Sequence, residues 1–187
     1  MIILGSSSPR RKELLSKITK NFTIMNPTFD EREISINEAH YAFEEAYHKA
    51  LSLVDKMDAR NDCLITVDTI VVLDNEIYGK PKDRDEAIKM LTKLSGKTHQ
   101  VISGYCLIYR DNVNSDEVIS EVTFNKLSKK EIEHYVDSIN VLDKAGAYSV
   151  QDDESFHLIK KIKGSTDNVM GFPVDEIKAI LVKYSLV

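Results

Sequence analysis

The sequence predicts an α/β fold in which helices flank a mixed, twisted β-sheet. Short apolar runs alternate along the chain with segments of helical periodicity, and some runs follow one another closely enough to form hairpins. The run CLITVDTIVVL is almost continuously apolar, which is typical of a central strand covered on both faces. The 187 residues contain no repeat, linker or low-complexity segment, so one domain over residues 1–187 is expected.

The amino-terminal stretch MIILGSSSPRRKELL predicts a strand, a small flexible loop and a helix. Ile2–Leu4 is the apolar strand, a glycine and three serines follow it, and Pro9 opens a helix with Ser8 as its N-cap. Arg10 and Arg11 then fall in the first helical turn, where the helix dipole disfavours cations. An anion held between them would explain this pattern as a phosphate cradle. An ordinary strand-to-helix turn with solvated arginines explains it about equally well, because the loop lacks the glycines of a Walker motif.

The segment before the central strand predicts one short strand and one long helix. Phe22–Met25 alternates like a strand, and Ser35–Glu38 has the form of a capping box that starts the helix. The apolar face of this helix consists of Ile36, Ala39, Phe43, Ala46, Ala50, Val54 and Met57. Lys49 is expected beside that face, and Asp30 and Glu31 precede the helix in an acidic loop.

The second half of the chain continues the alternation of strands and helices. The central strand, Cys63–Leu73, is expected to turn into a short returning strand that ends at Tyr78. A helix capped by Asp83 follows, and then strands at Val101–Tyr109 and Glu117–Leu127 joined by a polar turn around Asp111–Ser115. A capping box at Ser128–Glu131 opens the next helix, and a loop at Asp143–Gln151 runs into a strand. The last predicted elements are a strand at Phe156–Ile162, a flexible loop at Gly164–Pro173 and a final amphipathic helix.

The composition is that of an ordinary folded protein, with 42% hydrophobic and 29% charged residues. A net charge of −5 argues against broad attraction to nucleic acid or to an anionic membrane. No apolar run approaches membrane-spanning length and the amino end lacks the layout of a signal peptide, so a cytoplasmic protein without a membrane partner is expected. Cys63 and Cys106 fall inside apolar runs and are expected to be reduced core residues, with a disulfide between them left open.

Asp68 carries the sharpest single signal for chemistry. A carboxylate in the middle of an apolar strand is costly to bury unless it is paired or binds a metal. An active-site role is therefore favoured, and the alternative is a buried aspartate that accepts hydrogen bonds from nearby backbone.

Four other features are weaker when each is taken alone. Lys80, between Gly79 and Pro81, would present one charge on a stiff loop, although the same tripeptide occurs in plain surface turns. Lys49 has the position of a lysine that solvates a helix face. Asp30 and Glu31 offer oxygen ligands to a hard divalent cation, but acidic loops are usually only solvated. The five histidines show no zinc spacing and no paired nucleophile.

Taken together, these residues suit a metal-assisted attack of water on a polyphosphate. Cations, carboxylates and a serine-rich loop are present, and there is no covalent nucleophile paired with a base.

Eight motifs occur in the order seen in the Maf family, and they span nearly the whole chain. They are SSSPRRKELL, the acidic pair at Asp30 and Glu31, His48-Lys49-Ala50, Asp68-Thr69-Ile70-Val71, GKP, MLTKLSGKTHQV, DKAGAYSVQ and NVMGFP. The chain therefore resembles this family of nucleoside triphosphate pyrophosphatases, α/β proteins with two lobes around a central cleft. The resemblance implies a cytoplasmic, often dimeric enzyme that converts a nucleoside triphosphate to the monophosphate and pyrophosphate with Mg²⁺ or Mn²⁺. A free nucleoside triphosphate is then the expected partner, and a homodimer is a candidate assembly.

The resemblance also implies roles for individual residues. Asp68 looks like the catalytic base and, together with Glu31, a metal ligand. Arg10, Thr69 and Gln151 look like the substrate-selecting set of the branch that acts on dTTP and UTP. The residues expected to bind phosphate are Ser6, Ser8, Arg11, Lys49 and Lys80. Gly5 stands where family members often have alanine, and this glycine is expected to add backbone freedom.

Two other functions remain as alternatives to the enzyme. A nucleotide-binding regulator of septum formation or cell division, with little hydrolytic activity, would use the same phosphate cradle, and turnover would separate it from the enzyme. A nucleic-acid-binding module is disfavoured by the net charge and by the absence of a basic stretch with interleaved aromatic residues.

Overall fold

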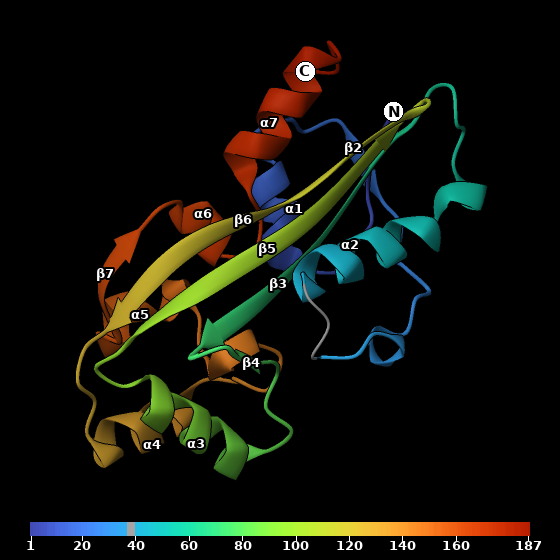
Figure 1. The fold of residues 1–187 in the computed structure, drawn as a ribbon. Helices are drawn as coiled ribbons and strands as arrows, with labels where there is room; N and C mark the ends of the chain where they lie inside the picture. The colour runs from blue at the N-terminus through green and yellow to red at the C-terminus, as the bar shows by residue number, and fades with distance from the viewer. Residues whose placement is uncertain (37–39) are drawn as a thin grey trace. The chain divides into compact units, whose positions relative to one another are not determined.

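The fold is a mixed α/β arrangement built on one seven-stranded sheet (Figure 1). The structure is a computed structural model, which describes residues 1–36 and 40–187. The strand order is β2-β1-β3-β5-β6-β7, and the short strand β4 pairs with β3. Strand β1 runs parallel to β2 and β3, whereas β3 with β4 and β6 with β7 are antiparallel pairs. The predicted fold class, an α/β protein with a mixed sheet flanked by helices, is confirmed.

The strands and helices have the following bounds. The strands are β1 (Ile2–Leu4), β2 (Phe22–Ile24), β3 (Cys63–Leu73), β4 (Glu76–Tyr78), β5 (Thr98–Tyr109), β6 (Asn112–Phe124) and β7 (Ile159–Lys163). The α-helices are α1 (Pro9–Leu15), α2 (Tyr41–Leu51), α3 (Arg84–Leu94), α4 (Lys129–Ser138), α5 (Asp153–Phe156), α6 (Thr166–Val169) and α7 (Val174–Lys183). The 3₁₀ turns are η1 (Glu31–Glu33), η2 (Val54–Lys56), η3 (Ala145–Ala147) and η4 (Val150–Asp152).

The described chain forms two compact units. Unit 1 consists of Met1–Thr69, Ser103–Val118 and Gly171–Val187, and unit 2 consists of Ile70–Ile102 and Ile119–Met170. The long strands β3, β5 and β6 contribute residues to both units. The arrangement of two lobes around a cleft stays a prediction.

Unit 1 begins as the sequence predicts. Ile2 of β1 lies opposite Phe22 of β2 and Cys63 of β3, so the amino-terminal strand is paired on both sides. Helix α1 starts at Pro9, and the Ser8 hydroxyl accepts a hydrogen bond from the Arg11 amide. Cysteines are free and buried at both predicted core positions, which confirms the expectation for these two residues.

Gly5 serves a different purpose from the one expected of it. Its backbone is not in the left-handed region, so the freedom of glycine is not used there. Instead, a Cβ atom at Gly5 would lie 2.6 Å from Thr66 Cγ2 and 3.0 Å from Leu53 Cδ1. Alanine at this position would therefore require the neighbouring side chains to shift, because they fill the space that a methyl group would take.

The predicted start of the long helix is wrong. Helix α2 begins at Tyr41, after His40 in the left-handed conformation, and Ser35 and Ile36 are not helical. Asn37, Glu38 and Ala39 of the predicted capping box and apolar face lie outside the described residues. The helix end is satisfied from β6, because Glu117 Oε1 accepts from the Phe43 amide at 3.2 Å. Sequence spacing does not reveal a cap supplied from a strand so far along the chain.

Helix α2 packs closely on the sheet. At Gly104 of β5, a Cβ atom would lie 2.2 Å from the carbonyl carbon and oxygen of Ala42. The backbone of α2 thus touches the backbone of β5, and only glycine permits this approach.

Unit 2 has its own apolar core, to which β4, α3 and α4 contribute. Helices α3 and α4 pack against each other, and both begin with the predicted caps, Asp83 and the Ser128–Glu131 capping box. An aromatic cluster lies in this core, where His99 makes edge-to-face contacts with Phe124 and Tyr148. His99 Nε2 also lies 2.7 Å from the Tyr148 hydroxyl.

Three predicted elements differ in detail. The turn between β5 and β6 is at Arg110 and Asp111 rather than Asp111–Ser115, because the polar residues that follow still pair as an exposed part of β6. The segment Asp143–Gln151 does not enter a strand but forms η3 and η4, since Gly146 and Ala147 both have positive φ. The strand predicted from Phe156 begins later, after the short helix α5, and the predicted loop after it contains α6.

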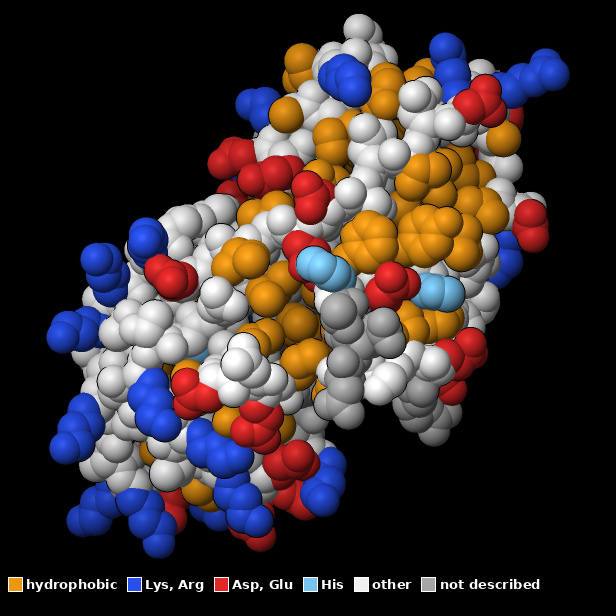
Figure 2. All heavy atoms as spheres, in the orientation of Figure 1, with side chains coloured by type: hydrophobic (Ala, Val, Ile, Leu, Met, Phe, Trp, Pro, Cys, Tyr) orange, Lys and Arg blue, Asp and Glu red, His pale blue; other side chains and the backbone are white. Residues whose placement is uncertain are grey.

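The surface carries charges of both signs. On the face that Figure 2 shows, Lys and Arg side chains alternate with Asp and Glu side chains, and hydrophobic side chains gather over α2. None of the helices in the described part of the chain is long and apolar enough to cross a membrane.

Candidate active site

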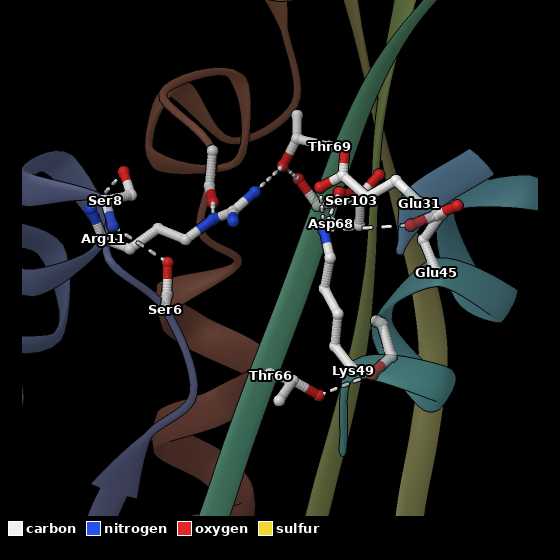
Figure 3. A network of polar contacts seen from close by, with 12 residues as sticks. Ser6, Ser8, Arg11, Glu31, Glu45, Lys49, Thr66, Asp68, Thr69 and Ser103 are labelled. Atoms are coloured by element: carbon white, nitrogen blue, oxygen red, sulfur yellow. Dashed lines mark hydrogen bonds and ion pairs between the residues drawn. The ribbon is translucent and has the colours of Figure 1, made fainter. Parts of the chain in front are cut away.

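Asp68 lies in the middle of β3, and 14% of its side chain is exposed. Side chains of consecutive strand residues point to opposite faces. Thr66 and Asp68 share the face toward α2, where the Thr66 hydroxyl donates to a backbone carbonyl of that helix at 2.6 Å. Thr69 belongs to the other face. Figure 3 accordingly shows Lys49 and Arg11 reaching β3 from different sides.

Lys49, in the last turn of α2, meets three carboxylates. Its Nζ lies 2.7 Å from Asp68 Oδ1, 2.7 Å from Glu31 Oε1 and 3.9 Å from Glu45 Oε2. Burial by itself lowers the pKa of Lys49, but the nearby carboxylates of Asp68 and Glu31 outweigh this effect and the pKa is raised. The alternative of a lysine that only solvates a helix face does not hold, because only 9% of this side chain is exposed.

Glu45 is a carboxylate of the site that sequence reasoning missed. It lies one helical turn before Lys49, and 1% of it is exposed. Among the described residues, neither of its carboxylate oxygens has a hydrogen-bond partner. Burial, reinforced by the charge of Asp68, raises the pKa of Glu45 to about 7. The available signal was a glutamate four residues before Lys49, at helical spacing from it.

The three carboxylates form a set that fits a hard divalent cation. One oxygen from each of Glu31, Glu45 and Asp68 lies within 4.8 Å of the other two. Oxygen ligands from carboxylates are those that Mg²⁺ prefers, and Mn²⁺ accepts them as well. The buried oxygens of Glu45 accept no hydrogen bond from the described residues and have the Lys49 ammonium 3.9 Å away, so a bound cation would satisfy a group that is otherwise costly to bury.

Arg11 forms the polar cluster on the other side of β3. Its Nε donates to the Gly171 carbonyl at 3.0 Å, and its Nη2 donates to Thr69 Oγ1 at 3.4 Å. Thr69 Oγ1 in turn lies 2.9 Å from Ser103 Oγ on β5. Burial lowers the pKa of Arg11, and the charges of Asp68 and other acidic groups oppose that shift. Gly171 has φ +105°, a conformation that favours glycine, at the point where it presents its carbonyl to Arg11.

The serine loop lies directly before α1. The buried Ser6 accepts a hydrogen bond through Oγ from the Ser8 amide at 3.1 Å, and Ser8 caps the helix. Arg10 is half-buried in the first turn. The predicted arrangement of a strand, a serine loop and a helix N-terminus carrying two arginines is therefore present.

Lys80 and Gln151 lie in unit 2. Lys80 is exposed, and the loop that carries it is tied to η3 because the Gly146 amide donates to the Gly79 carbonyl at 3.1 Å. A Cβ atom at Gly146 would lie 3.0 Å from Val71 Cγ2, so η3 sits tightly on β3.

The segment that carries Gln151 is held in place by a buried tyrosine. Gln151 is exposed in η4, and its backbone N–H donates to the Ser149 hydroxyl at 3.4 Å. Tyr135, on α4, is fully buried. Its hydroxyl donates to Asp152 Oδ2 at 2.7 Å and accepts from the Ser149 amide at 3.2 Å. The backbone on both sides of Gln151 is therefore fixed while its side chain stays accessible.

Comparison with known proteins gives a single, consistent answer. The sequence profile described as Maf-like protein matches residues 1–184. The chain belongs to the Maf family. Two curated relatives, from Chlamydia caviae and Clostridioides difficile, are named dTTP/UTP pyrophosphatase. They are 36% and 40% identical to this Maf protein, over 99% and 98% of its length and 94% of theirs.

The fold of this Maf protein is also similar to a solved structure outside these relatives. The Staphylococcus aureus Ham1 protein matches it with a TM-score of 0.55 at 15% sequence identity, over 98% of both chains. At that identity the likeness concerns the fold alone.

The described part of this Maf protein gathers several predicted site residues within unit 1. Asp68 contacts Lys49, which contacts Glu31, and the adjacent Thr69 contacts Arg11. Lys49 therefore lies at Asp68 itself, and Arg11 reaches the residue next to it.

Besides Glu45, sequence reasoning missed Ser103 and Gly171. Ser103 is an isolated serine in an apolar strand, and only the pairing of the strands brings it to Thr69. Gly171 belongs to the NVMGFP motif, where a glycine before Phe172 was the available signal.

Proposed function

We propose that this Maf-family chain hydrolyses nucleoside triphosphates, with dTTP and UTP preferred, to the monophosphate and pyrophosphate. The observation that carries the proposal is the position of Asp68, a partly exposed carboxylate paired with a buried lysine at 2.7 Å and next to two further carboxylates. The names of the curated relatives support the same activity.

Asp68 acts as the general base in this proposal. It takes a proton from water as the water oxygen attacks the α-phosphorus, the bond from that phosphorus to the bridging oxygen breaks, and pyrophosphate leaves. A divalent cation held by Asp68, Glu31 and Glu45 would supply acidification of that water and neutralisation of phosphate charge. Mg²⁺ and Mn²⁺ are the cations proposed.

The cationic residues bind the triphosphate. Arg10 and Arg11, with the serine loop of Ser6 and Ser8, offer charged donors and hydroxyl groups at the start of α1. Lys49 and Lys80 add two point charges, the first from α2 and the second from the loop after β4. The developing charge on the phosphate oxygens is what these groups stabilise.

Base selection is assigned to Gln151, Thr69 and Arg10. The Gln151 amide can donate and accept at the same time, which matches the adjacent carbonyl and N–H groups of uracil and thymine. Adenine and guanine present other patterns, and a polar site rejects a mismatched edge because polar groups covered by the bound base would be left unpaired. The proposed partner is a free nucleotide, and the cytoplasmic location and the homodimer stay predictions.

Pyrophosphate release from dTTP, UTP, CTP, GTP and ATP, with and without Mg²⁺, tests the proposal. We expect turnover that depends on Mg²⁺ and is greatest with dTTP and UTP. Asp68→Asn should reduce turnover about 10²–10⁴-fold, because that is the usual contribution of a general base. Asp137→Asn is the matched control, since this exposed aspartate pairs only with Arg84 among the contacts described at its carboxylate, and its loss should leave turnover unchanged.

Either of two outcomes would contradict the proposal. Near-normal turnover by Asp68→Asn would remove this residue as the base. Tight nucleotide binding by the unaltered protein without pyrophosphate release would favour the regulator of cell division instead.

A further inference from the structure

The ammonium group of Lys49 lies among the oxygens that would bind a divalent cation. Figure 3 shows its side chain directed at Asp68, with Glu31 and Glu45 alongside. Nζ makes contacts of 2.7 Å with Asp68 and 2.7 Å with Glu31, and it lies 3.9 Å from Glu45. Each of these three carboxylates also contributes to the oxygen set of the proposed cation site.

A lysine ammonium and a divalent cation compete for such a set. Mg²⁺ and Mn²⁺ bind carboxylate oxygens directly, and the same three carboxylates are now hydrogen-bonded to Lys49 or placed near it. Two cations among the same carboxylates would also repel each other, and the burial of Glu45 and Lys49 reduces the screening of that repulsion by water. The ammonium must therefore move before the oxygens become available.

The Lys49 ammonium has other acceptors available once a triphosphate is bound. Its four-carbon stem is flexible and its Nζ is a point charge with three rotatable donors. The proposed function brings phosphate oxygens to this site, and these oxygens can replace the carboxylates as acceptors for Nζ.

We propose that Lys49 is a built-in counter-ion of the carboxylate set, so that a divalent cation binds well only when the ammonium has been drawn away by triphosphate oxygens. The inference rests on the proposed function for the identity of the triphosphate, but the competition between Lys49 and the cation does not depend on turnover. Glu45 gives a second observation that points to a cation at this site. It is 1% exposed, its oxygens lack hydrogen-bond partners among the described residues, and it belongs to the same oxygen set.

Binding of Mn²⁺ alone, without nucleotide, measures this competition directly by calorimetric titration. We expect the unaltered protein to bind Mn²⁺ weakly, and Lys49→Met to lower the Kd for Mn²⁺ at least about tenfold, because the ammonium no longer opposes the cation. Lys49→Arg keeps a cation at the position and should bind Mn²⁺ as weakly as the unaltered protein. Lys144→Met is the matched control, since Lys144 is also largely buried and pairs with a single carboxylate, Asp143. It should leave Mn²⁺ binding unchanged.

A double variant shows whether the gain arises at these carboxylates. Lys49→Met combined with Asp68→Asn should lose the tightened binding, because the charged carboxylate of Asp68 becomes a neutral amide. If Lys49→Met does not fold, Lys49→Gln tests the same loss of charge with a polar side chain. A neutral variant that folds and binds Mn²⁺ no more tightly than the unaltered protein would overturn the inference.

The outcomes separate this inference from the proposed function. If the unaltered protein releases pyrophosphate with Mg²⁺ but neutral variants at Lys49 gain no Mn²⁺ affinity, the enzyme assignment stands and the counter-ion role falls. If the neutral variants gain affinity but no nucleotide is hydrolysed, the counter-ion role stands and the enzyme assignment falls.

Discussion

Gly104 is the position where a single methyl group should disturb the candidate site most. An ideal Cβ atom at this residue lies 2.2 Å from the Ala42 carbonyl and 2.3 Å from the Phe43 amide nitrogen, whereas ordinary contacts begin at 3.4 Å. All of these atoms belong to backbone, so no side chain can rotate away. Gly104→Ala therefore requires the start of α2 to retreat from β5 by about 1 Å or more, because the packed interior has no spare volume there.

The consequences can be measured on stability and on chemistry. Overpacking of this kind costs about 1–3 kcal/mol, which lowers the Tm of a protein this size by about 3–10 °C. Helix α2 also carries Glu45 and Lys49, and a displacement of about 1 Å at a catalytic constellation costs about 10²-fold in turnover. Thermal unfolding and pyrophosphate release from dTTP are the two assays.

A second glycine serves as the control for stability. No heavy atom described in the structure, beyond the chain neighbours, lies within 4 Å of an ideal Cβ at Gly79. Gly79→Ala should therefore change the free energy of unfolding by less than about 1 kcal/mol, in the stabilising direction. If the Tm of Gly104→Ala stayed as close to that of the unaltered protein as the Tm of Gly79→Ala does, the close contact between α2 and β5 would be refuted.

Two further predictions concern unit 2. Burial lowers the pKa of His99 to about 4, so the folded protein keeps this imidazole neutral while the unfolded chain takes up a proton as the pH falls below about 6.5. The contribution of His99 to the free energy of unfolding is complete above pH 6.5 and is lost as the pH falls toward 4, by up to about 3 kcal/mol. Urea unfolding at pH 7.5 and at pH 4.5 measures this loss, which should be smaller for His99→Gln than for the unaltered protein. Equal losses in the two proteins would contradict the assignment. Tyr135→Phe removes both hydrogen bonds that the Tyr135 hydroxyl makes beside Gln151. Their loss should lower the free energy of unfolding by about 1–3 kcal/mol. It should also raise the KM for dTTP more than it lowers kcat. Tyr184→Phe, which loses one hydrogen bond from Asn114, is its control, and an equal change in KM for both variants would contradict the positioning role.

Local patterns predicted most of the elements, because their signals lie close together in sequence. The caps at Ser8, Asp83 and Ser128 each depend on residues within one helical turn, and all three are present. The start of α2 was predicted wrongly because its cap comes from Glu117, 74 residues after Phe43. A strand was expected after Asp143 because the sequence alone did not show that Ala147 would adopt a positive φ.

From the residue pattern alone, the sharpest signal for the candidate site lies where a residue violates its local pattern. Asp68 interrupts an apolar strand, and that conflict identifies it without any knowledge of its neighbours. Ser103 and Glu45 give weak signals, because one serine or glutamate is common in any strand or helix. Their significance depends on distances across the sheet, such as the 2.9 Å between Ser103 and Thr69.

The alternation of side chains along β3 explains why one short sequence serves two clusters. Asp68 and Thr69 are neighbours, yet the first meets Lys49 from α2 and the second meets Arg11 from α1. A shift of the strand by one residue would exchange these partners and place a hydroxyl among the carboxylates. The register of β3 is set by pairing with β1, in which Ile2 lies opposite Cys63, and both residues are buried. The apolar core of unit 1 therefore fixes which face receives the carboxylate, and the chemistry of the site depends on packing five residues away from it.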